Sequence, residues 1–405
     1  MREEVISAHG FELESQPLHK TGQIPAKIGS MQVYPKAEED DPPGAPVLGE
    51  RSYMGAYYLF PQYWLPFVYF LPGGAILDAS SSSSDPLNHH QYAFDVGYDT
   101  RANQPREEII YTNASLPFYI DAGFANDYLY LVGAGLTEHI TFAQLDTRHY
   151  ILPNSNKWTA GPIVTYKMTD YAPFLLTEFG PGIETTFNNV SAQKDFMISP
   201  EAGERLYLAY DYYLSQWGNT SFPLVNGEGV FYLSGKPLPE HHVLFFKGSA
   251  WLAPQQQTIL TGTQQAGGEY PGSLLSTSYL IRGYPVGEFL GSTMYVGNFE
   301  YRFPLYYQYS GNGTFPLFVD RWHGALICDA GTLKGRYYDS SFAPNTNNGV
   351  FTDIGTFYVS AGAELKLDVT LFYAVPVTVR LGYYYGFTQN AYGGQSYLIG
   401  LGSVQ

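Results

Sequence analysis

The stretch VTVRLGYYYGF, residues 377–387, decides the fold class because its apolar side chains recur at every second position. Leu381, Tyr383 and Phe387 share one face, whereas Thr378 and Arg380 lie on the other. A period of two residues is the pattern of a β-strand with one apolar face. The segment is therefore predicted to be a strand with an apolar face and a polar face.

Other parts of the chain repeat this alternation. It recurs in AGAELKLDVTLFY (361–373), MYVGNFEYRF (294–303), ERLYLAYDYYL (204–214) and QYAFDVGYDT (91–100). These runs reach ten or more residues, which exceeds the usual length of globular strands and suits a tilted strand that crosses a bilayer. Tyr and Phe gather at run ends, as expected for an aromatic girdle at the membrane interface.

Further runs extend the pattern over most of the chain, separated by Gly, Pro, Asn and Ser clusters typical of turns. We expect these strands near residues 106–114, 117–135, 138–150, 158–171, 174–190, 222–236, 241–252, 318–333 and 396–404. The total is roughly sixteen, within the range of single-chain outer-membrane barrels. The sequence predicts an all-β fold, a transmembrane antiparallel β-barrel over residues 51–405.

Composition excludes some classes of function. The 405 residues carry a net charge of −16, so no basic stripe is available to neutralise nucleic-acid phosphates. Only 14% of residues are charged, whereas 17% are aromatic. The single cysteine, Cys328, allows no disulfide framework within the chain. We expect it to face lipid or core rather than to act as a nucleophile.

The first part of the chain has a different character. Residues 1–50 are polar, include AEEDDPPGAP and show no periodicity, so we expect a tether outside the barrel. No signal peptide is visible in MREEVISAHGFELESQ, because it is polar where an apolar core should begin. Residues 52–77 are uncharged and long enough for a transmembrane helix, but prolines interrupt them, so an extended conformation is expected.

Motifs for catalysis or cofactor binding are not found. The pairs His89-His90 and His241-His242 place neighbours on opposite faces of a strand, so neither should chelate a metal, and we expect solvated loop histidines. GEGVFYLSGKP, residues 227–237, has the wrong spacing for a phosphate loop. The sequence predicts no catalytic residue, no cofactor and no metal site, and the protein is not expected to be an enzyme.

One region carries a family resemblance. YLIRGYPVGEFLGSTMYVGNFEYRFPL, residues 279–305, and WHGALICDAGTL, residues 322–333, resemble the signature region of the outer-membrane assembly-factor superfamily, the bacterial surface antigen family. BamA, TamA and the two-partner-secretion translocons are members. The resemblance implies that Arg282, Gly283 and Tyr284 form the tip of a long loop, about residues 255–293, folded into the barrel lumen. It also implies that Arg282 meets two inward carboxylates, Glu300 and Asp329.

The resemblance further implies a function in handling polypeptides. Such a barrel inserts outer-membrane proteins, or exports a client or fused polypeptide, through a plugged lumen. Its implied location is the bacterial outer membrane, in contact with lipid and with partner subunits in the periplasm or at the surface. This mechanism needs no active site but requires a weak seam between the first and last strands. Many glycines occur in the final strands, and glycine weakens a strand.

Two alternatives remain open. A passive barrel would act as a channel or as a surface anchor for a partner or fused domain. Its lumen would favour cations if Asp95, Asp211, Glu364 and Asp368 point inward, as the alternation indicates. A barrel hydrolase is the third reading, and no Ser, His and Asp spacing supports it.

Overall fold

The structure, a computed structural model, describes part of the chain. The described residues are 59–403, with gaps at 62, 72–73, 132–135, 153–154, 172–173, 194–195, 219–220, 254–263, 269–278, 312, 338–349, 373–374 and 392. The predicted tether, residues 1–50, and much of the predicted loop 255–293 fall outside them. Within the described ranges no helix is long and apolar enough to cross a membrane.

Nineteen strands of the described chain form one sheet. They are β1 (Leu65–Leu71), β2 (Gly74–Ser84), β3 (His90–Asp99), β4 (Gln104–Asn113), β5 (Tyr119–Leu131), β6 (Leu136–Leu152), β7 (Ser155–Tyr171), β8 (Phe174–Asn188), β9 (Gly203–Tyr213), β10 (Phe222–Leu233), β11 (Val243–Leu252), β12 (Gln264–Gly267), β13 (Tyr279–Leu280), β14 (Phe289–Gly311), β15 (Leu317–Tyr337), β16 (Val350–Thr352), β17 (Phe357–Leu371), β18 (Val375–Gly386) and β19 (Gln395–Ser403).

Most strands pair antiparallel with their neighbours in the chain. The order runs from β1 to β11 and continues through β14, β15, β17, β18 and β19. The short strands β12, β13 and β16 are additions to this order, and β12 pairs with β13 in parallel. The other sixteen described strands form the wall, which confirms the predicted barrel of roughly sixteen strands.

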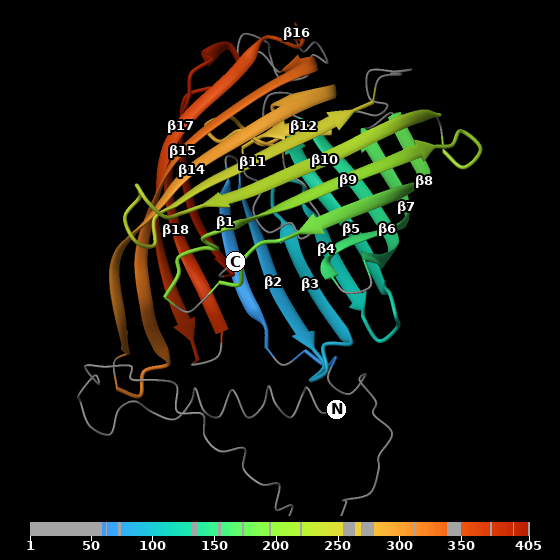
Figure 1. Cartoon of the computed structure of the whole chain (residues 1–405). Coiled ribbons are helices and arrows are strands. Elements are labelled where there is room, and N and C mark those ends of the chain that lie inside the picture. The colour runs from blue at the N-terminus through green and yellow to red at the C-terminus, as the bar shows by residue number, and fades with distance from the viewer. Residues whose placement is uncertain are drawn as a thin grey trace, which may run out of the picture. The chain divides into compact units, whose positions relative to one another are not determined.

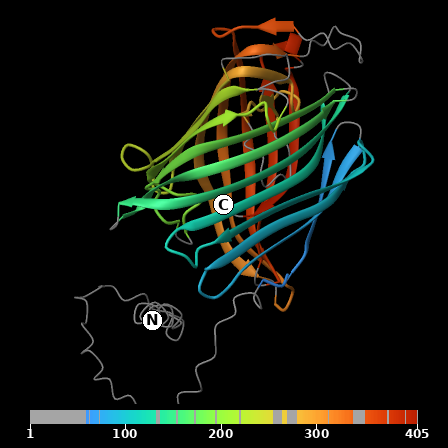
Figure 2. The same ribbon diagram turned by 90° about the vertical axis from the view of Figure 1, so that its right-hand side faces the viewer.

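The wall curls into a barrel of tilted strands. Figures 1 and 2 show β4 to β10 on one side and β14 to β18 on the other, with β1 lying near the last strands. β1 and β19 lie beside each other, but among the described residues no backbone pairing joins them. In the described part of the chain, the seam between the first and last strands therefore shows no ladder like those between the other wall strands.

Side chains alternate between the two faces of the wall. On β9, Leu206, Leu208, Tyr210 and Tyr212 are 43–51% exposed, whereas Asp211 between them is buried. On β18, Leu381 and Tyr383 are exposed and Tyr384 is buried. The outer face is therefore the apolar face, as the alternation predicts. We call the opposite face the inner face.

Two sequence expectations can be compared with the described strands. The described part of the uncharged segment 52–77 contains no helix and contributes β1 and the start of β2. The expectation of solvated loop histidines is wrong for His90, which is the first residue of β3 and hydrogen-bonds through Nδ1 to the Tyr111 hydroxyl at 2.7 Å. His241 and His242 lie in the connection before β11, as expected, and contact Glu201 and the Tyr301 hydroxyl respectively, each at 2.7 Å.

Candidate functional site

A buried turn connects β13 to β14 along the inner face of the wall. It spans residues 281–288, and its backbone is tied to β12 because Ile281 N donates to Gly267 O at 2.7 Å. Gly268 N donates to Pro285 O at 2.9 Å. The turn changes direction at Gly283, which has φ of +89°. We call residues 281–288 the Arg282 turn.

Arg282 fixes the turn to two carboxylates of the wall. Its Nε donates to Asp329 Oδ2 at 2.8 Å and its Nη2 to Asp329 Oδ1 at 2.7 Å, a two-pronged arrangement. The backbone N of Arg282 also donates to Asp329 Oδ2, at 2.9 Å. Its Nη1 donates to Glu300 Oε1 at 2.7 Å. Charge-assisted bonds in such a fork are among the strongest that side chains form.

The register of β14 and β15 places these carboxylates. Asn298 on β14 pairs with Asp329 on β15, and Glu300 lies two residues farther along β14 on the same face. Asn298 Nδ2 donates both to Leu280 O at 2.7 Å and to Asp329 Oδ1 at 2.8 Å. The amide therefore links β13 to the carboxylate that holds Arg282.

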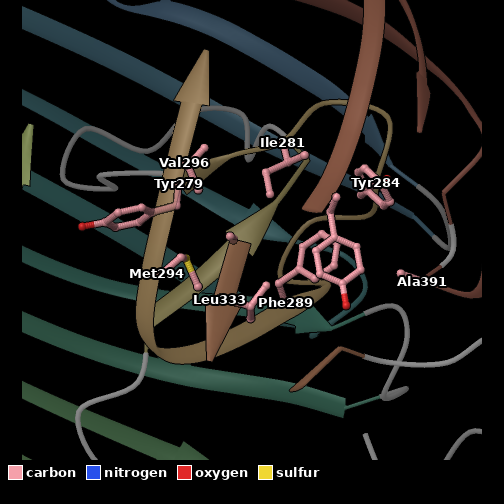
Figure 3. Packing of buried hydrophobic residues seen from close by; sticks show 10 residues of the cluster. Tyr279, Ile281, Tyr284, Phe289, Met294, Val296, Leu333 and Ala391 are labelled. Carbon is pink, nitrogen blue, oxygen red and sulfur yellow. The ribbon is translucent and has the colours of Figure 1, made fainter. Parts of the chain in front are cut away.

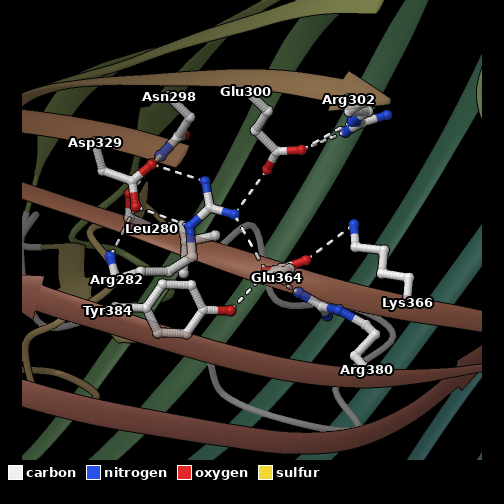
Figure 4. A network of polar contacts seen from close by, with 10 residues as sticks. All are labelled: Leu280, Arg282, Asn298, Glu300, Arg302, Asp329, Glu364, Lys366, Arg380 and Tyr384. Carbon is white, nitrogen blue, oxygen red and sulfur yellow. Dashed lines mark hydrogen bonds and ion pairs between the residues drawn. The ribbon is translucent and has the colours of Figure 1, made fainter. Parts of the chain in front are cut away.

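A third carboxylate extends the cluster onto β17 and β18 (Figure 4). Glu364 Oε1 lies 3.6 Å from Arg282 Nη1 and accepts hydrogen bonds from Arg380 Nη2 at 2.8 Å and from the Tyr384 hydroxyl. Two more cations complete it: Lys366 lies 2.9 Å from Glu364 Oε2, and Arg302 Nε donates to Glu300 Oε2 at 2.8 Å. We call these residues the Arg282 network.

Charge in the Arg282 network is nearly balanced. Four cations, Arg282, Arg302, Lys366 and Arg380, surround the three carboxylates Glu300, Asp329 and Glu364. Burial alone would lower the pKa of Arg282. The hydrogen bonds and charges of Asp329, Glu300 and Glu364 instead raise it well above its usual value. The guanidinium therefore stays charged in its buried position.

Gly283 and Tyr284 dock the turn against β17 and the end of β18. A Cβ on Gly283 would lie 2.6 Å from Gly386 N, and this close approach together with the positive φ requires glycine. The Tyr284 hydroxyl donates to Val359 O at 3.0 Å. Its ring packs edge-on against Phe289, with ring centroids 5.2 Å apart.

Apolar packing surrounds this contact. Figure 3 shows Ile281, Tyr284 and Phe289 gathered with Met294 and Leu333. Phe289 in turn lies 4.5 Å, between ring centroids, from Tyr358 of β17. Polar contacts on one side of the turn and aromatic packing on the other hold it against the wall.

The structure brings Arg282, Glu300 and Asp329 into direct contact, and it adds partners that the sequence did not identify. Glu364 was expected on the inner face but not as a partner of Arg282. Asn298 and Tyr384 were not singled out. A signal for Tyr384 was present, because period two places it on the same face as Gly382 and Gly386 and away from Tyr383.

Among the described residues, metal-binding or nucleophilic side chains do not form a second candidate site. Among these residues, no group of three or more His, Cys, Asp or Glu side chains could hold a metal ion. Cys328 is exposed on β15, on the outer face next to the inward Asp329. The Arg282 network is therefore the best-defined polar site of the described chain.

Comparisons with known proteins identify the fold. No protein-family model matches the chain, and no curated protein matches it. The structure is similar to that of BamA from Haemophilus ducreyi lacking POTRA domains 1–3, with a TM-score of 0.53 and 13% identity, covering 85% of this chain and 76% of that one.

CdiB from Escherichia coli matches with a TM-score of 0.51 and 12% identity, over 81% of this chain and 59% of that one. CdiB from Acinetobacter baumannii matches with a TM-score of 0.50 and 12% identity, over 81% and 56%. This chain thus spans less than two thirds of either CdiB chain. The likeness shows that the chain has the barrel fold of BamA and CdiB.

Proposed function

We propose that the protein is a bacterial outer-membrane β-barrel that inserts or exports polypeptides, with the Arg282 turn as a movable plug on the inner face. The observation that carries the proposal is the Arg282 network itself. It holds the turn through hydrogen bonds and ion pairs from three wall strands, β14, β15 and β17, without a covalent bond. Such contacts can be exchanged for water, so the turn can be held firmly and still released.

The outer face supports placement in a membrane. Large apolar side chains are exposed on wall strands from β2 through β19, including Leu77, Leu145, Ile183, Leu326 and Leu381. A soluble protein rarely exposes apolar surface around its whole circumference. A lipid environment covers this surface, as in other transmembrane barrels.

The seam supports movement of polypeptides. Outward residues of β19, Tyr397 and Ile399, are 72% and 75% exposed, whereas Leu381 and Tyr383 on the neighbouring β18 are 47% and 42% exposed. β19 is therefore covered less on the side facing β1, where backbone pairing is absent among the described residues. An unpaired strand edge is available to pair with another chain.

Partners and chemistry follow from this role. The partners are membrane lipid, a client or fused polypeptide, and subunits in the periplasm or at the surface. The protein uses no catalytic residue and no cofactor, because the work is done by the seam and by the plug. The passive channel or surface anchor is the alternative, and the inward carboxylates Asp95, Asp211, Glu364 and Asp368 favour it by offering a path for cations.

A reversible disulfide tests whether the turn must move. A Cβ on Gly331 would lie 3.3 Å from Ile281 Cγ1, so cysteines at these two positions are within disulfide reach. Ile281→Cys and Gly331→Cys are combined with Cys328→Ser, which removes the native thiol and leaves Arg282 intact. The oxidised and reduced proteins are then compared in lipid vesicles that receive a small outer-membrane protein unfolded in urea.

We expect the reduced variant to accelerate folding of the added protein above the rate in protein-free vesicles. Oxidation should lower the rate toward that background, and dithiothreitol should restore it. Cys328→Ser alone is the control and should be insensitive to oxidation. No acceleration by the reduced protein, together with uptake of small cationic solutes into the vesicles, would instead establish the passive barrel.

A further inference from the structure

A cavity lies on the side of the barrel away from the Arg282 network. Its volume is about 690 Å³, within the range of small-molecule sites. Inner-face side chains of β4 to β11 line it, and Tyr279, residues 264–268, Val286 and Gly287 close one side. The cavity is therefore bounded partly by the wall and partly by the turn. We call it the acidic cavity.

Negative charge dominates the lining. Seven carboxylates line the cavity: Glu108, Asp127, Asp146, Glu178, Glu184, Asp211 and Glu228. Three basic side chains accompany them: Arg148, Lys167 and Arg205. Charged partners just outside the lining, Arg106 and Lys247 with Asp78 and Asp121, add two of each sign. With all groups ionised, carboxylates exceed cations by four, both among the lining residues alone and when the charged partners outside the lining are included.

Asp211 is the one carboxylate in this lining whose own side chain has no recorded partner in the described chain. It is 5% exposed, and its Oδ1 accepts no hydrogen bond. On the adjacent strand, Gly182 pairs with it in register, and a Cβ there would lie 2.4 Å from Oδ1. The glycine therefore leaves space for the carboxylate. A buried ionised carboxylate without a partner is costly, and a cation from outside the chain would satisfy it.

The lining also indicates the kind of cation. Aromatic side chains stand among the carboxylates, namely Phe142, Tyr207, Tyr213, Phe222, Trp251 and Tyr279. Aromatic faces attract ammonium and guanidinium groups, whereas a divalent metal requires several oxygen ligands around one point. Among the described residues no such metal-binding group exists. Charge and aromatic lining together fit an organic cation.

We propose that the acidic cavity binds flexible organic cations that carry ammonium or guanidinium groups, with Asp211 as the anchoring carboxylate. Two sources offer this chemistry: a free polyamine, and the Lys or Arg side chains of a polypeptide within the barrel. The site is defined by its lining alone, so it does not depend on whether the barrel inserts or exports polypeptides.

Calorimetric titration of the detergent-solubilised protein with spermidine, at a pH near 8, tests the site. We expect saturable binding that weakens as NaCl rises from about 50 to about 500 mM, because salt screens charge pairs. Asp211→Asn should raise the dissociation constant about tenfold, as loss of one charge-assisted hydrogen bond predicts. Glu107→Gln removes a carboxylate from the exposed face of β4 and should leave the constant unchanged.

A lysine-rich peptide and Ca²⁺ are titrated in parallel. Binding of spermidine alone assigns the site to free polyamines, and binding of the peptide alone assigns it to polypeptide side chains; either result supports the proposal when Asp211→Asn weakens it. An unheated gel confirms that each variant is folded. Absence of binding by both organic cations would overturn the proposal. So would equal binding by wild type and Asp211→Asn, or Ca²⁺ binding that displaces spermidine from the same site.

Discussion

In the Arg282 network each of the three carboxylates lies within ion-pair distance of at least one cation, whereas in the acidic cavity carboxylates outnumber cations and Asp211 has no recorded partner. Both regions lie on the inner face of one sheet, and both bury charged side chains. Buried charges that satisfy one another hold a structure in place. Buried charges in excess cost stability and are available to a ligand. The same barrel thus contains a holding region and a binding region.

The largest expected effect comes from breaking the holding region. Arg282→Ala leaves Asp329 with only Asn298 among its described side-chain partners, while Arg302, Lys366 and Arg380 still neutralise Glu300 and Glu364. Removing one member of a buried pair costs about 3–5 kcal/mol. Urea unfolding in detergent, followed by tryptophan fluorescence, should show a loss of that size.

Arg282→Lys is the matched variant for this prediction. It keeps the charge but cannot span two carboxylates as a guanidinium does, so it should recover less than half of the lost stability. Full recovery by lysine would mean that charge alone holds the turn and that the fork geometry is irrelevant.

A second prediction tests whether the strands that carry the Arg282 network tolerate an added charge on their outer face. Leu381 lies on the outer face of β18, beside the inward Arg380. Leu381→Arg should cost about 2–4 kcal/mol in a lipid bilayer, as for an arginine near the midplane of a barrel. The cost of an arginine should shrink near the bilayer surface. Thr356→Arg, at the residue just before β17 begins, is therefore the comparison variant and should cost less. Equal stability of wild type and Leu381→Arg would mean that the faces are reversed.

A smaller loss is expected at the edge of the holding region. Tyr384→Phe removes the hydroxyl that donates to Glu364, while Arg380 and Lys366 still contact that carboxylate. The free energy of unfolding should fall by about 1.5–3 kcal/mol, as for one hydrogen bond to a charged group. Tyr383→Phe, on the outer face of the same strand, should lower the free energy of unfolding by much less. Equal losses in the two variants would place Tyr384 outside the network.

The smallest change, and one of opposite sign, is expected in the acidic cavity. Without added cation, Asp211→Asn removes a buried charge that has no recorded partner, so stability should stay constant or rise by up to about 1 kcal/mol. The same unfolding assay measures it. A loss comparable to that of Arg282→Ala would show that Asp211 holds the fold, and the difference between the two regions would disappear.

Much of the wall could be predicted from the sequence because alternation directly reports which face a side chain occupies. Alternation placed Glu364 on the inner face in this way, whereas the family resemblance implied that Glu300 and Asp329 point inward toward Arg282. The partnership of Glu364 and Tyr384 with Arg282 could not be predicted, because it depends on the register between strands far apart in the sequence. No local pattern specifies that register.

Limits of local pattern also explain the remaining differences. The histidines were assigned to solvated loops because neighbours in a strand point to opposite faces, so neither His89-His90 nor His241-His242 could readily chelate one metal. Contacts to Tyr111, Glu201 and Tyr301 arise from other strands and connections. The short strands β12 and β13 were not predicted, since four- and two-residue segments are too short to show alternation. They form through pairing of β12 with β13 and β14.

A double-mutant cycle between Arg282 and Asp329 tests most directly whether the Arg282 network holds the turn on the inner face. The unfolding free energies of wild type, Arg282→Ala, Asp329→Ala and the double variant are measured under one condition. Because the two side chains share two charge-assisted hydrogen bonds, we expect a coupling energy of about 2–3 kcal/mol. The backbone bond from Arg282 N to Asp329 Oδ2 persists in Arg282→Ala and does not enter this coupling. Additive losses, within about 0.5 kcal/mol, would contradict the contact and with it the role of Arg282 as the residue that fixes the turn.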